Sequence, residues 1–511
     1  MNIVVAGGGT AGWLTALYAQ HICPKDTITL IESEEVGILG AGEGSTPQLP
    51  WILYALGISE KELIKYANAT LKMGISFENW RGDGKKYLHN FQVSDSNLSP
   101  YNFTPSKNTL TSGLVDNGQQ YAYINAIANG ETMDDVSLVS KLAYNNKSPF
   151  INENGKVSFV SNYSYHFDAS LLAKFLRMKA EERGIKRIEG KITDIISNED
   201  GGVGLIKCGD IEVKSDFVFD CTGFARLFIG KHFSAKWKSY SDKLKVNTAI
   251  PFFLPKSDTL PPYTKAIAMK YGWMWQIPLQ NRWGCGYVFD DRYINVEEAK
   301  KEVEQMVGQE IKINKIIPFD AGRYETPWIK NCIAVGLSST FTEPIEATSI
   351  WLIITQLRNL TSDVIHNINA DEIYDYNKLI ADTGDGVLDF LQLHYITDRN
   401  DTDFWKDYQK TTTLTPKMKR RLDSWKRRTP NNSDTDGLFT QFEQYSWLAV
   451  CYGNGIIDQS VYERENEEYD LDNKLSKWFM KYESDINYAE SISFTHEELI
   501  ELIKSNDIIL N

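Results

Sequence analysis

The chain has 511 residues, and its 42% hydrophobic and 24% charged content is ordinary for a globular protein with two or three domains. A formal net charge of −14 at pH 7 argues against nucleic acids and anionic membranes as partners, but it leaves small molecules open. No apolar run reaches the roughly 18 residues that a membrane helix needs, and no signal peptide precedes the first strand, so we expect a cytoplasmic protein.

The cysteines and histidines show no metal-ligand spacing. The six cysteines are scattered without a CxxC pair, and the seven histidines include no HExxH. We therefore expect reduced thiols in the core and no metal ion.

A glycine-rich turn follows the first predicted strand, residues 2–6. Gly7, Gly9 and Gly12 form G-x-G-x-x-G, and an Ala/Leu-rich helix comes directly after it. The first glycine permits a tight turn, the second lets backbone approach a pyrophosphate, and the third lets the helix pack close to the strand. This arrangement predicts a dinucleotide-binding βαβ unit with its phosphate at a helix N-terminus.

A second predicted strand, residues 27–33, contains an acidic residue at the spacing that this unit requires. Glu32 lies twenty residues after Gly12. At this distance a carboxylate is expected to accept a hydrogen bond from a ribose hydroxyl.

Residues 59–72 are predicted to form a helix. Ser59 is its expected N-cap, and Glu62 three residues later completes a capping box. Lys72 lies at the predicted end of this helix, where a lysine on its own is usually a solvated surface residue.

A long polar segment at about 82–120 contains His89 and Phe91. A loop of this length in a compact domain is usually functional or disordered. The next clear element is an amphipathic helix over 168–183, which Asp168 is expected to cap.

The middle of the chain is rich in strand patterns. Residues 217–223 predict a buried strand of the same sheet as the first, and residues 245–290 predict an antiparallel region. Trp273 and Trp275 are spaced i, i+2 and therefore lie on one face of a strand, where a core position is the ordinary alternative to a functional one.

The last predicted strand is 332–337, and from about residue 350 the chain is mainly helical. We expect an α/β fold with two domains. The first covers 1–349, with substrate-facing insertions at about 82–165, and the second is a helical capping subdomain over 350–511.

Several motifs together resemble the flavin-dependent tryptophan halogenase family. They are GGGTAGW at 7–13, TLKMGISFENW at 70–80, GWMWQIP at 272–278, GLSSTFTEPIE at 336–346 and HYITDRNDTDFW at 394–405. The resemblance implies a Rossmann-like FAD-binding box of the GR2/aromatic-monooxygenase type, with an antiparallel substrate sheet and a helical C-terminal subdomain.

The resemblance also implies a chemistry. FADH2 from a separate flavin reductase, O2 and a halide ion give hypohalous acid, which a lysine holds beside an aromatic substrate or carries as a haloamine. Lys72 matches that lysine, and Glu346 matches the glutamate that orients the oxidant and takes the ring proton. Trp273 and Trp275 match the residues that divide the flavin chamber from the substrate chamber.

Further cofactor contacts follow from the same resemblance, including a strap at 38–46. Together with the glycine turn, the expected cofactor-binding residues are Gly7, Gly9, Thr10, Ala11, Gly12, Glu32, Leu39, Ala41, Gly44, Ile192, Leu337 and Ile350.

The sequence departs from the family at the halide site. The family has the pattern F-x-x-P-x-x-S-x-G. In this chain Ala347 stands at the serine position and Ser349 stands at the glycine position. Thr348 and Ser349 are still expected to offer backbone N–H groups to the anion. We expect bromide or iodide to be preferred to chloride.

The substrate end departs as well, because the segment that grips free tryptophan looks shorter here. His89, Phe91 and Trp447 remain as rings that can enclose an aromatic substrate. We therefore expect a small indole-like or phenolic substrate. The alternatives are an FAD-dependent aromatic monooxygenase and a non-catalytic flavin-binding protein, and the sequence leaves a homo-oligomer open.

Overall fold

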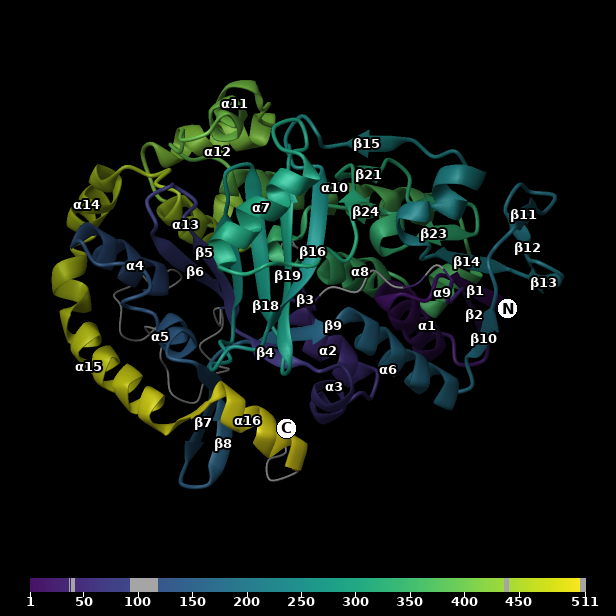
Figure 1. Cartoon of the computed structure of the whole chain (residues 1–511), viewed down its shortest axis with the longest axis horizontal. Coiled ribbons are helices and arrows are strands. Elements are labelled where there is room, and N and C mark those ends of the chain that lie inside the picture. Colours follow the sequence, from purple (N-terminus) through teal and green to yellow (C-terminus); the bar gives the residue numbers. More distant parts are fainter. Residues whose placement is uncertain (36, 38–41, 92–117, 436–440, 506–511) are drawn as a thin grey trace. The chain divides into compact units, whose positions relative to one another are not determined.

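The computed structural model describes all residues except 36, 38–41, 92–117, 436–440 and 506–511 (Figure 1). The chain forms two compact units that alternate along the sequence. The first unit comprises 1–69, 165–247 and 317–388, and the second comprises 70–164, 248–316 and 389–511. The functional division expected at residue 349 stays a prediction.

A six-stranded sheet forms the centre of the first unit, in the order β10-β2-β1-β14-β23-β22. All neighbours are parallel except β22 and β23. The registers Ile3↔Ile28 and Ile3↔Phe217 place buried apolar strands side by side, and this confirms the predicted βαβ start and the shared sheet.

The sheet of the first unit is built from β1 (Asn2–Ala6), β2 (Thr27–Glu32), β10 (Lys186–Glu189), β14 (Phe217–Asp220), β22 (Trp328–Ile329) and β23 (Cys332–Ala334). Smaller strands are β3 (Gly42–Gly44), β9 (Ser164–Asp168), β11 (Asp194–Ser197), β12 (Val203–Cys208), β13 (Ile211–Lys214), β15 (Trp237–Ser239), β20 (Ile317–Pro318), β21 (Gly322–Tyr324) and β24 (Thr340–Phe341). The helices are α1 (Thr10–Ile22), α2 (Gln48–Ala55), α3 (Glu60–Tyr66), α6 (Ala169–Glu182), α8 (Thr348–Arg358), α9 (Ser362–His366) and the first part of α10 (Ala370–His394). Short helical turns are η1 (Gly223–Ala225), η2 (Leu227–His232), η3 (Gly336–Ser338) and η4 (Pro344–Glu346).

The second unit contains a mainly antiparallel sheet in the order β16-β19-β18-β17-β5-β6, in which only β17 and β5 run parallel. Helix α7 (Val296–Val307) lies across β16, β18 and β19 (Figure 1). Its Ala299 and Val303 belong to one buried cluster with Ile250 and Tyr287 of the strands. The antiparallel region predicted over 245–290 is therefore confirmed.

The strands of the second unit are β4 (Thr70–Lys72), β5 (Gly74–Glu78), β6 (Lys86–Asn90), β7 (Lys147–Glu153), β8 (Lys156–Phe159), β16 (Thr248–Pro255), β17 (Thr264–Ala268), β18 (Gly272–Pro278), β19 (Arg282–Phe289) and β25 (Ser493–Thr495). Its other helices are α4 (Gly118–Ala128), α5 (Leu138–Tyr144), α11 (Asp403–Thr411), α12 (Pro416–Trp425), α13 (Gln444–Gly453), α14 (Gln459–Glu468), α15 (Leu471–Ile492) and α16 (His496–Ser505), and η5 (Asn432–Asp434) is a single turn.

Two predicted elements differ from the structure. The capping box of Ser59 and Glu62 is present, but its helix α3 ends at Tyr66, and Lys72 lies on strand β4. Asn68 has φ 54°, and this left-handed residue ends the helical path.

The polar segment at 82–120 is also not one long loop. Residues 86–90 form β6, which pairs with β5 through the register Ile75↔His89. Residues 92–117 of that segment lie outside the described residues.

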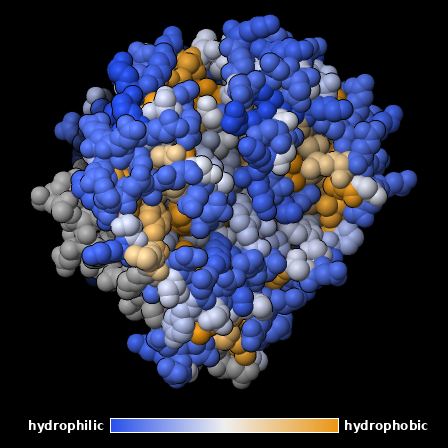
Figure 2. All heavy atoms as spheres, turned by 90° about the vertical axis from the view of Figure 1, so that its left-hand side faces the viewer, coloured by the Kyte–Doolittle hydropathy of each residue, from blue (hydrophilic) through white to orange (hydrophobic). Residues whose placement is uncertain are grey.

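None of the helices among the described residues is both long and apolar enough to cross a bilayer. On the face shown in Figure 2, hydrophobic side chains form small separate patches among hydrophilic ones. All six cysteines are buried and free, as expected for thiols of the core.

Candidate active site

The glycine turn between β1 and α1 has the geometry that its motif predicts. Gly7 has φ +115°, and a Cβ there would lie 2.2 Å from the carbonyl oxygen of Cys221. A Cβ on Gly12 would lie 1.8 Å from the Gly7 carbonyl oxygen. A Cβ on Gly9 would meet no atom within 4 Å, so open space lies where a pyrophosphate would approach. These residues fit a dinucleotide.

Glu32 ends β2 beside this turn. A Cβ on Gly8 would lie 1.5 Å from Glu32 Oε2, so the carboxylate directly adjoins the turn. Arg187 Nε lies 2.6 Å from Glu32 Oε1, and Arg177 lies 3.5 Å from the same oxygen. Two guanidinium groups therefore hold the carboxylate in place, and its expected bond to a ribose stays a prediction.

Three other expected cofactor contacts come from elements that converge in the first unit. Around Gly336 in η3, a Cβ would lie 3.1 Å from Ala11 Cβ and 3.2 Å from Ile353 Cγ1. Helix α1, turn η3 and helix α8 therefore meet at one place. Leu337 follows Gly336 directly, and Ile350 is buried one turn before Ile353 on α8.

The remaining strap and sheet residues are only partly described. Gly44 lies on β3 and pairs with His166 of β9, whereas Leu39 and Ala41 lie outside the described residues. Ile192 packs against the buried cluster of the first unit. Burial, assisted by the Asp168 carboxylate, raises the pKa of Glu43 on β3 to about 7.

Glu346 and the expected halide site occupy the turn before α8. Glu346 ends η4 and is only 3% exposed. Ala347 follows with φ 54° and ψ 36°, a left-handed conformation that is unusual for a residue with a Cβ. Thr348 and Ser349 then begin α8, and the Thr348 hydroxyl lies 3.1 Å from that of Thr342. The backbone N–H groups of this first turn carry the positive end of the helix dipole.

In the second unit, Lys72 is completely buried on β4. Its Nζ lies 5.2 Å from the centroid of the Phe91 ring, within cation–π distance. The Phe91 backbone N–H donates to the Met73 carbonyl at 2.8 Å, so the ring is fixed next to the strand that carries the lysine. A buried lysine facing an aromatic ring is different from a solvated lysine at the end of a helix.

The strand that carries Lys72 is held from both sides. The Thr70 hydroxyl donates to the Pro278 carbonyl at 2.7 Å, and the Leu71 N–H donates to His496 Nε2 at 2.9 Å. His496 Nδ1 in turn donates to the Leu260 carbonyl at 2.9 Å, so its ring is neutral in this arrangement. Burial lowers the pKa of His496 to about 4. No sequence pattern indicated this residue, which lies 424 positions after Lys72 (496 − 72 = 424).

An aromatic group surrounds His89 on β6. His89 Nε2 lies 2.9 Å from the Ser446 hydroxyl. The rings of Phe390, Phe442 and Tyr445 have centroids 5.8, 6.4 and 6.0 Å from that of His89. Sequence patterns did not single out these three rings, because they approach His89 only through the packing of α10 and α13.

Trp447 lies on α13 and is 2% exposed. Its indole N–H donates to the Phe442 carbonyl at 3.2 Å, and its ring meets Phe390 edge-on at 4.9 Å. Arg421 stacks over the other side, with 4.2 Å between the guanidinium carbon and the ring centroid. Trp447 therefore packs against the Phe390 ring and holds the backbone of Phe442 by a hydrogen bond.

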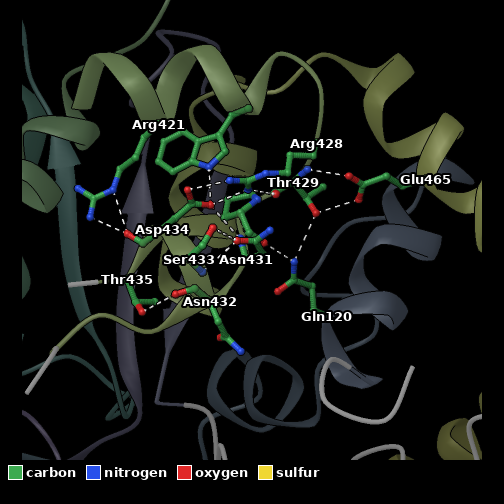
Figure 3. Close-up of polar contacts among 12 residues, drawn as sticks. Gln120, Arg421, Arg428, Thr429, Asn431, Asn432, Ser433, Asp434, Thr435 and Glu465 are labelled. Atoms are coloured by element: carbon green, nitrogen blue, oxygen red, sulfur yellow. Dashed lines mark hydrogen bonds and ion pairs between the residues drawn. The ribbon is translucent and has the colours of Figure 1, made fainter. Parts of the chain in front are cut away.

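A buried polar network fixes the segment before α13 (Figure 3). Arg421 donates to the Asp434 carbonyl oxygen and, at 3.1 Å, to Asp389 Oδ2. The Asp434 carboxylate accepts from Trp425 Nε1 at 3.1 Å and from Arg428 at 2.7 Å. Burial would raise the pKa of Asp434, but the hydrogen bonds from Arg428, Asn431 and Trp425 and the charge of Arg428 together lower it.

The network continues to α14 and α4. Thr429 donates its backbone N–H and its hydroxyl to the two carboxylate oxygens of Glu465, each at 2.8 Å. Gln120 donates to the Pro430 carbonyl at 2.6 Å. The chain that leads into the aromatic group is therefore anchored at several points (Figure 3).

The two tryptophans of β18 lie together as expected. Trp273 and Trp275 have ring centroids 6.2 Å apart and are 1% and 9% exposed. Trp275 pairs with Gly286 of β19, and a Cβ on that glycine would lie 2.1 Å from the indole. Gly286 therefore leaves the room that the Trp275 ring occupies.

Comparison with known proteins identifies the family. A family model described as tryptophan halogenase matches residues 2–467. The tryptophan 6-halogenase SttH of Streptomyces toxytricini is 31% identical over 484 residues, which cover 89% of this chain and 90% of that protein. The tryptophan 7-halogenase RebH of Lentzea aerocolonigenes is 30% identical over 487 residues, with the same two coverages.

Solved structures give the same picture. The crystal structure of SttH has a TM-score of 0.86 at 28% identity, covering 98% of this chain and 99% of that one. Xcc4156, a flavin-dependent halogenase from Xanthomonas campestris, has a TM-score of 0.84 at 29% identity, covering 98% and 97%. The chain therefore belongs to the tryptophan halogenase family and is a flavin-dependent halogenase.

Proposed function

We propose that this enzyme halogenates a small electron-rich aromatic compound, such as an indole, through hypohalous acid held at Lys72. The buried Lys72 ammonium, facing the Phe91 ring, is the observation that carries this proposal. Bound at Gly7, Gly9, Gly12 and the neighbouring contacts, FADH2 from a separate flavin reductase would supply the electrons with which O2 oxidises halide to hypohalous acid.

Lys72 would hold the hypohalous acid by donating a hydrogen bond to its oxygen. A charged donor makes a strong hydrogen bond in a buried site, where water competes little. The same bond draws electrons toward the oxygen and makes the halogen more electrophilic. Because the lysine is on a strand fixed by Thr70 and His496, its position needs no rearrangement during the reaction.

Glu346 would act as the general base. The ring carbon attacks the halogen, the carbon–halogen bond forms, and the oxygen–halogen bond breaks. The ring proton then passes to the Glu346 carboxylate, and the departing hydroxide becomes water with a proton from Lys72. Proton transfer by a positioned side chain contributes typically about 10²- to 10⁴-fold to a rate.

The substrate would lie among the rings of the second unit. His89 and Phe91, with Phe442 and Tyr445, offer flat apolar surfaces that suit an indole or a phenol. Trp447 supports this group from behind. Free tryptophan is a poorer candidate, since the sequence segment that would grip its ammonium and carboxylate is shorter.

The halide would bind at the first turn of α8, at Thr348 and Ser349. The replacement of the usual serine and glycine by Ala347 and Ser349 favours bromide or iodide over chloride in our proposal, because these larger ions are also easier to oxidise. We further propose a cytoplasmic setting, in which a reductase delivers FADH2 by diffusion.

Mass spectrometry of the products tests the proposal. Indole is incubated with the enzyme, FAD, a flavin reductase, NADH and equal concentrations of chloride, bromide and iodide. We expect haloindole from the wild type, with bromide or iodide ahead of chloride, and at least a 100-fold loss in Lys72→Ala. Lys65→Ala, which removes an exposed lysine on α3, is the matched control.

Other products would overturn parts of the proposal. Hydroxyindole that does not depend on halide would identify an aromatic monooxygenase. Full activity of Lys72→Ala would remove the role of Lys72. Dominant chlorination would remove the halide preference, and turnover of free tryptophan with a tight dissociation constant would remove the substrate class. FAD binding without product from indole, phenol or tryptophan would favour a non-catalytic flavoprotein.

A further inference from the structure

Three side chains of different metal-binding types meet at the far end of α1 in the first unit. Cys23 is the C-cap of α1, Asp26 lies in the turn before β2, and His366 ends the short helix α9. One ligand atom of each, a sulfur, a carboxylate oxygen and a ring nitrogen, all lie within 4.8 Å of one another. Spacing along the sequence does not predict this cluster, because His366 is 343 residues from Cys23 (366 − 23 = 343).

The hydrogen bonds of His366 turn one ring nitrogen toward the other two residues. Nδ1 lies 2.6 Å from the Ser362 carbonyl oxygen, which can only accept, so Nδ1 carries a proton. Nε2 lies 2.8 Å from Asp26 Oδ2. A metal ion bound between Nε2 and Oδ2 would use both atoms as ligands.

A histidine whose Nδ1 donates to a backbone carbonyl and whose Nε2 faces a carboxylate has the arrangement of a metal ligand. The other oxygen of Asp26, Oδ1, lies 2.6 Å from the Met1 amino group. The second carboxylate oxygen of Asp26, Oδ2, is the one that faces His366.

We propose that Cys23, Asp26 and His366 bind a divalent transition-metal ion of the zinc type, with water as the fourth ligand. A thiolate and an imidazole favour zinc or cobalt over magnesium or calcium, which prefer oxygen ligands. Binding of the ion releases the proton of the Cys23 thiol. Tetrahedral coordination at about 2.0 Å needs the nitrogen and oxygen roughly half an ångström farther apart than they lie now.

The ion would join the turn between α1 and β2 to α9. Both segments belong to the first unit, and α1 is the helix of the glycine turn. A metal that binds only the folded state stabilises it by mass action. This role is separate from the halogenation chemistry, and therefore its test does not depend on the substrate or on the flavin.

Cobalt titration of the full chain tests the site. The protein carries a C-terminal affinity tag without histidine, so that the Met1 amino group is native and no tag binds the metal. Chelator-treated protein is titrated with Co²⁺, and a thiolate-to-cobalt charge-transfer band with intense tetrahedral visible bands is expected at one equivalent. Zn²⁺ should abolish these bands and raise the melting temperature.

Two variants and two controls locate the ion. Cys23→Ser should remove the charge-transfer band, and His366→Ala should weaken Co²⁺ binding at least tenfold. Cys208→Ser and His232→Ala, which change a thiol and an imidazole elsewhere in the first unit, should bind as the wild type does. Absence of the cobalt bands in the wild type, or bands that persist in Cys23→Ser, would overturn the proposal. Circular dichroism of each variant verifies that it is folded.

Discussion

At the scale of single residues, two glycines of the glycine turn are glycines for different physical reasons. Gly12 is required by the protein itself, because a Cβ would collide with the Gly7 carbonyl oxygen. Gly9 has φ −76° and ψ −175°, a conformation open to any residue, and its Cβ position is empty. The protein alone gives no reason for a glycine at position 9, so a ligand is the natural explanation.

This difference predicts opposite behaviour of two alanine variants. Gly9→Ala should fold with a melting temperature within about 2 °C of the wild type and lose at least tenfold in FAD affinity, because the methyl group fills the phosphate approach. Gly12→Ala should lower the free energy of unfolding by several kcal/mol. The new methyl group would clash with the Gly7 carbonyl, and backbone cannot move aside as a flexible side chain can. Titration of flavin fluorescence and thermal unfolding measure both. Unchanged FAD affinity in Gly9→Ala would contradict the assignment of this turn to the cofactor.

At the scale of elements, strand β4 illustrates how a distant residue holds the strand of Lys72, the proposed catalytic lysine. His496, from the start of α16, accepts the Leu71 N–H next to Lys72 and donates to the Leu260 carbonyl. Only the neutral ring can do both. Protonation of His496 would place two donors face to face at Leu71, so the strand that carries Lys72 depends on an uncharged histidine.

The depressed pKa of His496 predicts a pH dependence of stability. The folded-state pKa of about 4 lies below the ordinary 6.5, so the unfolded chain takes up the proton first. The stabilisation is complete above about pH 6.5 and is lost as the pH falls toward 4. Between pH 7 and pH 5 the free energy of unfolding should fall by about 2 kcal/mol through this residue.

Urea unfolding of the wild type and His496→Gln at both pH values measures the effect. Glutamine has a donor and an acceptor but no titration, so its loss between pH 7 and pH 5 should be about 2 kcal/mol smaller. His21→Gln, an exposed histidine, is the control and should follow the wild type. Equal losses in all three proteins would show that His496 does not titrate as its burial implies.

At the scale of the whole molecule, the two proposed catalytic residues belong to different units. Lys72 is part of the second unit, and Glu346 is part of the first. If both act on the same reacting substrate, removing one makes the other less useful. Effects of residues that act together on one step are strongly non-additive.

A double-mutant cycle measures this coupling. Lys72→Met and Glu346→Gln should each lower kcat by about 10²- to 10⁴-fold, and the double variant should be little slower than the slower single variant. The product of the two single losses in the double variant would show independent action. The rate of haloindole formation under saturating halide gives the comparison, and circular dichroism controls for folding.

The sequence by itself determined those helices, strands and turns that depend on interactions within a few residues. The strand, glycine turn and helix at the start were predicted correctly, because a run of apolar residues and the positions of glycines act within a few residues. The motif resemblance also reached the right family. The predicted helix over 59–72 was wrong, because the left-handed residue Asn68 interrupts the helical pattern and residues 70–72 form strand β4.

Only the tertiary structure decided which distant residues meet. Phe442 and Tyr445 reach His89, and His496 reaches the strand of Lys72, through packing between segments hundreds of residues apart. Spacing along a chain has no information about such contacts, since they depend on how whole elements pack once their apolar faces are buried. The physical reason is that local hydrogen bonding selects each helix and strand, whereas burial of side chains from many elements at once selects their neighbours.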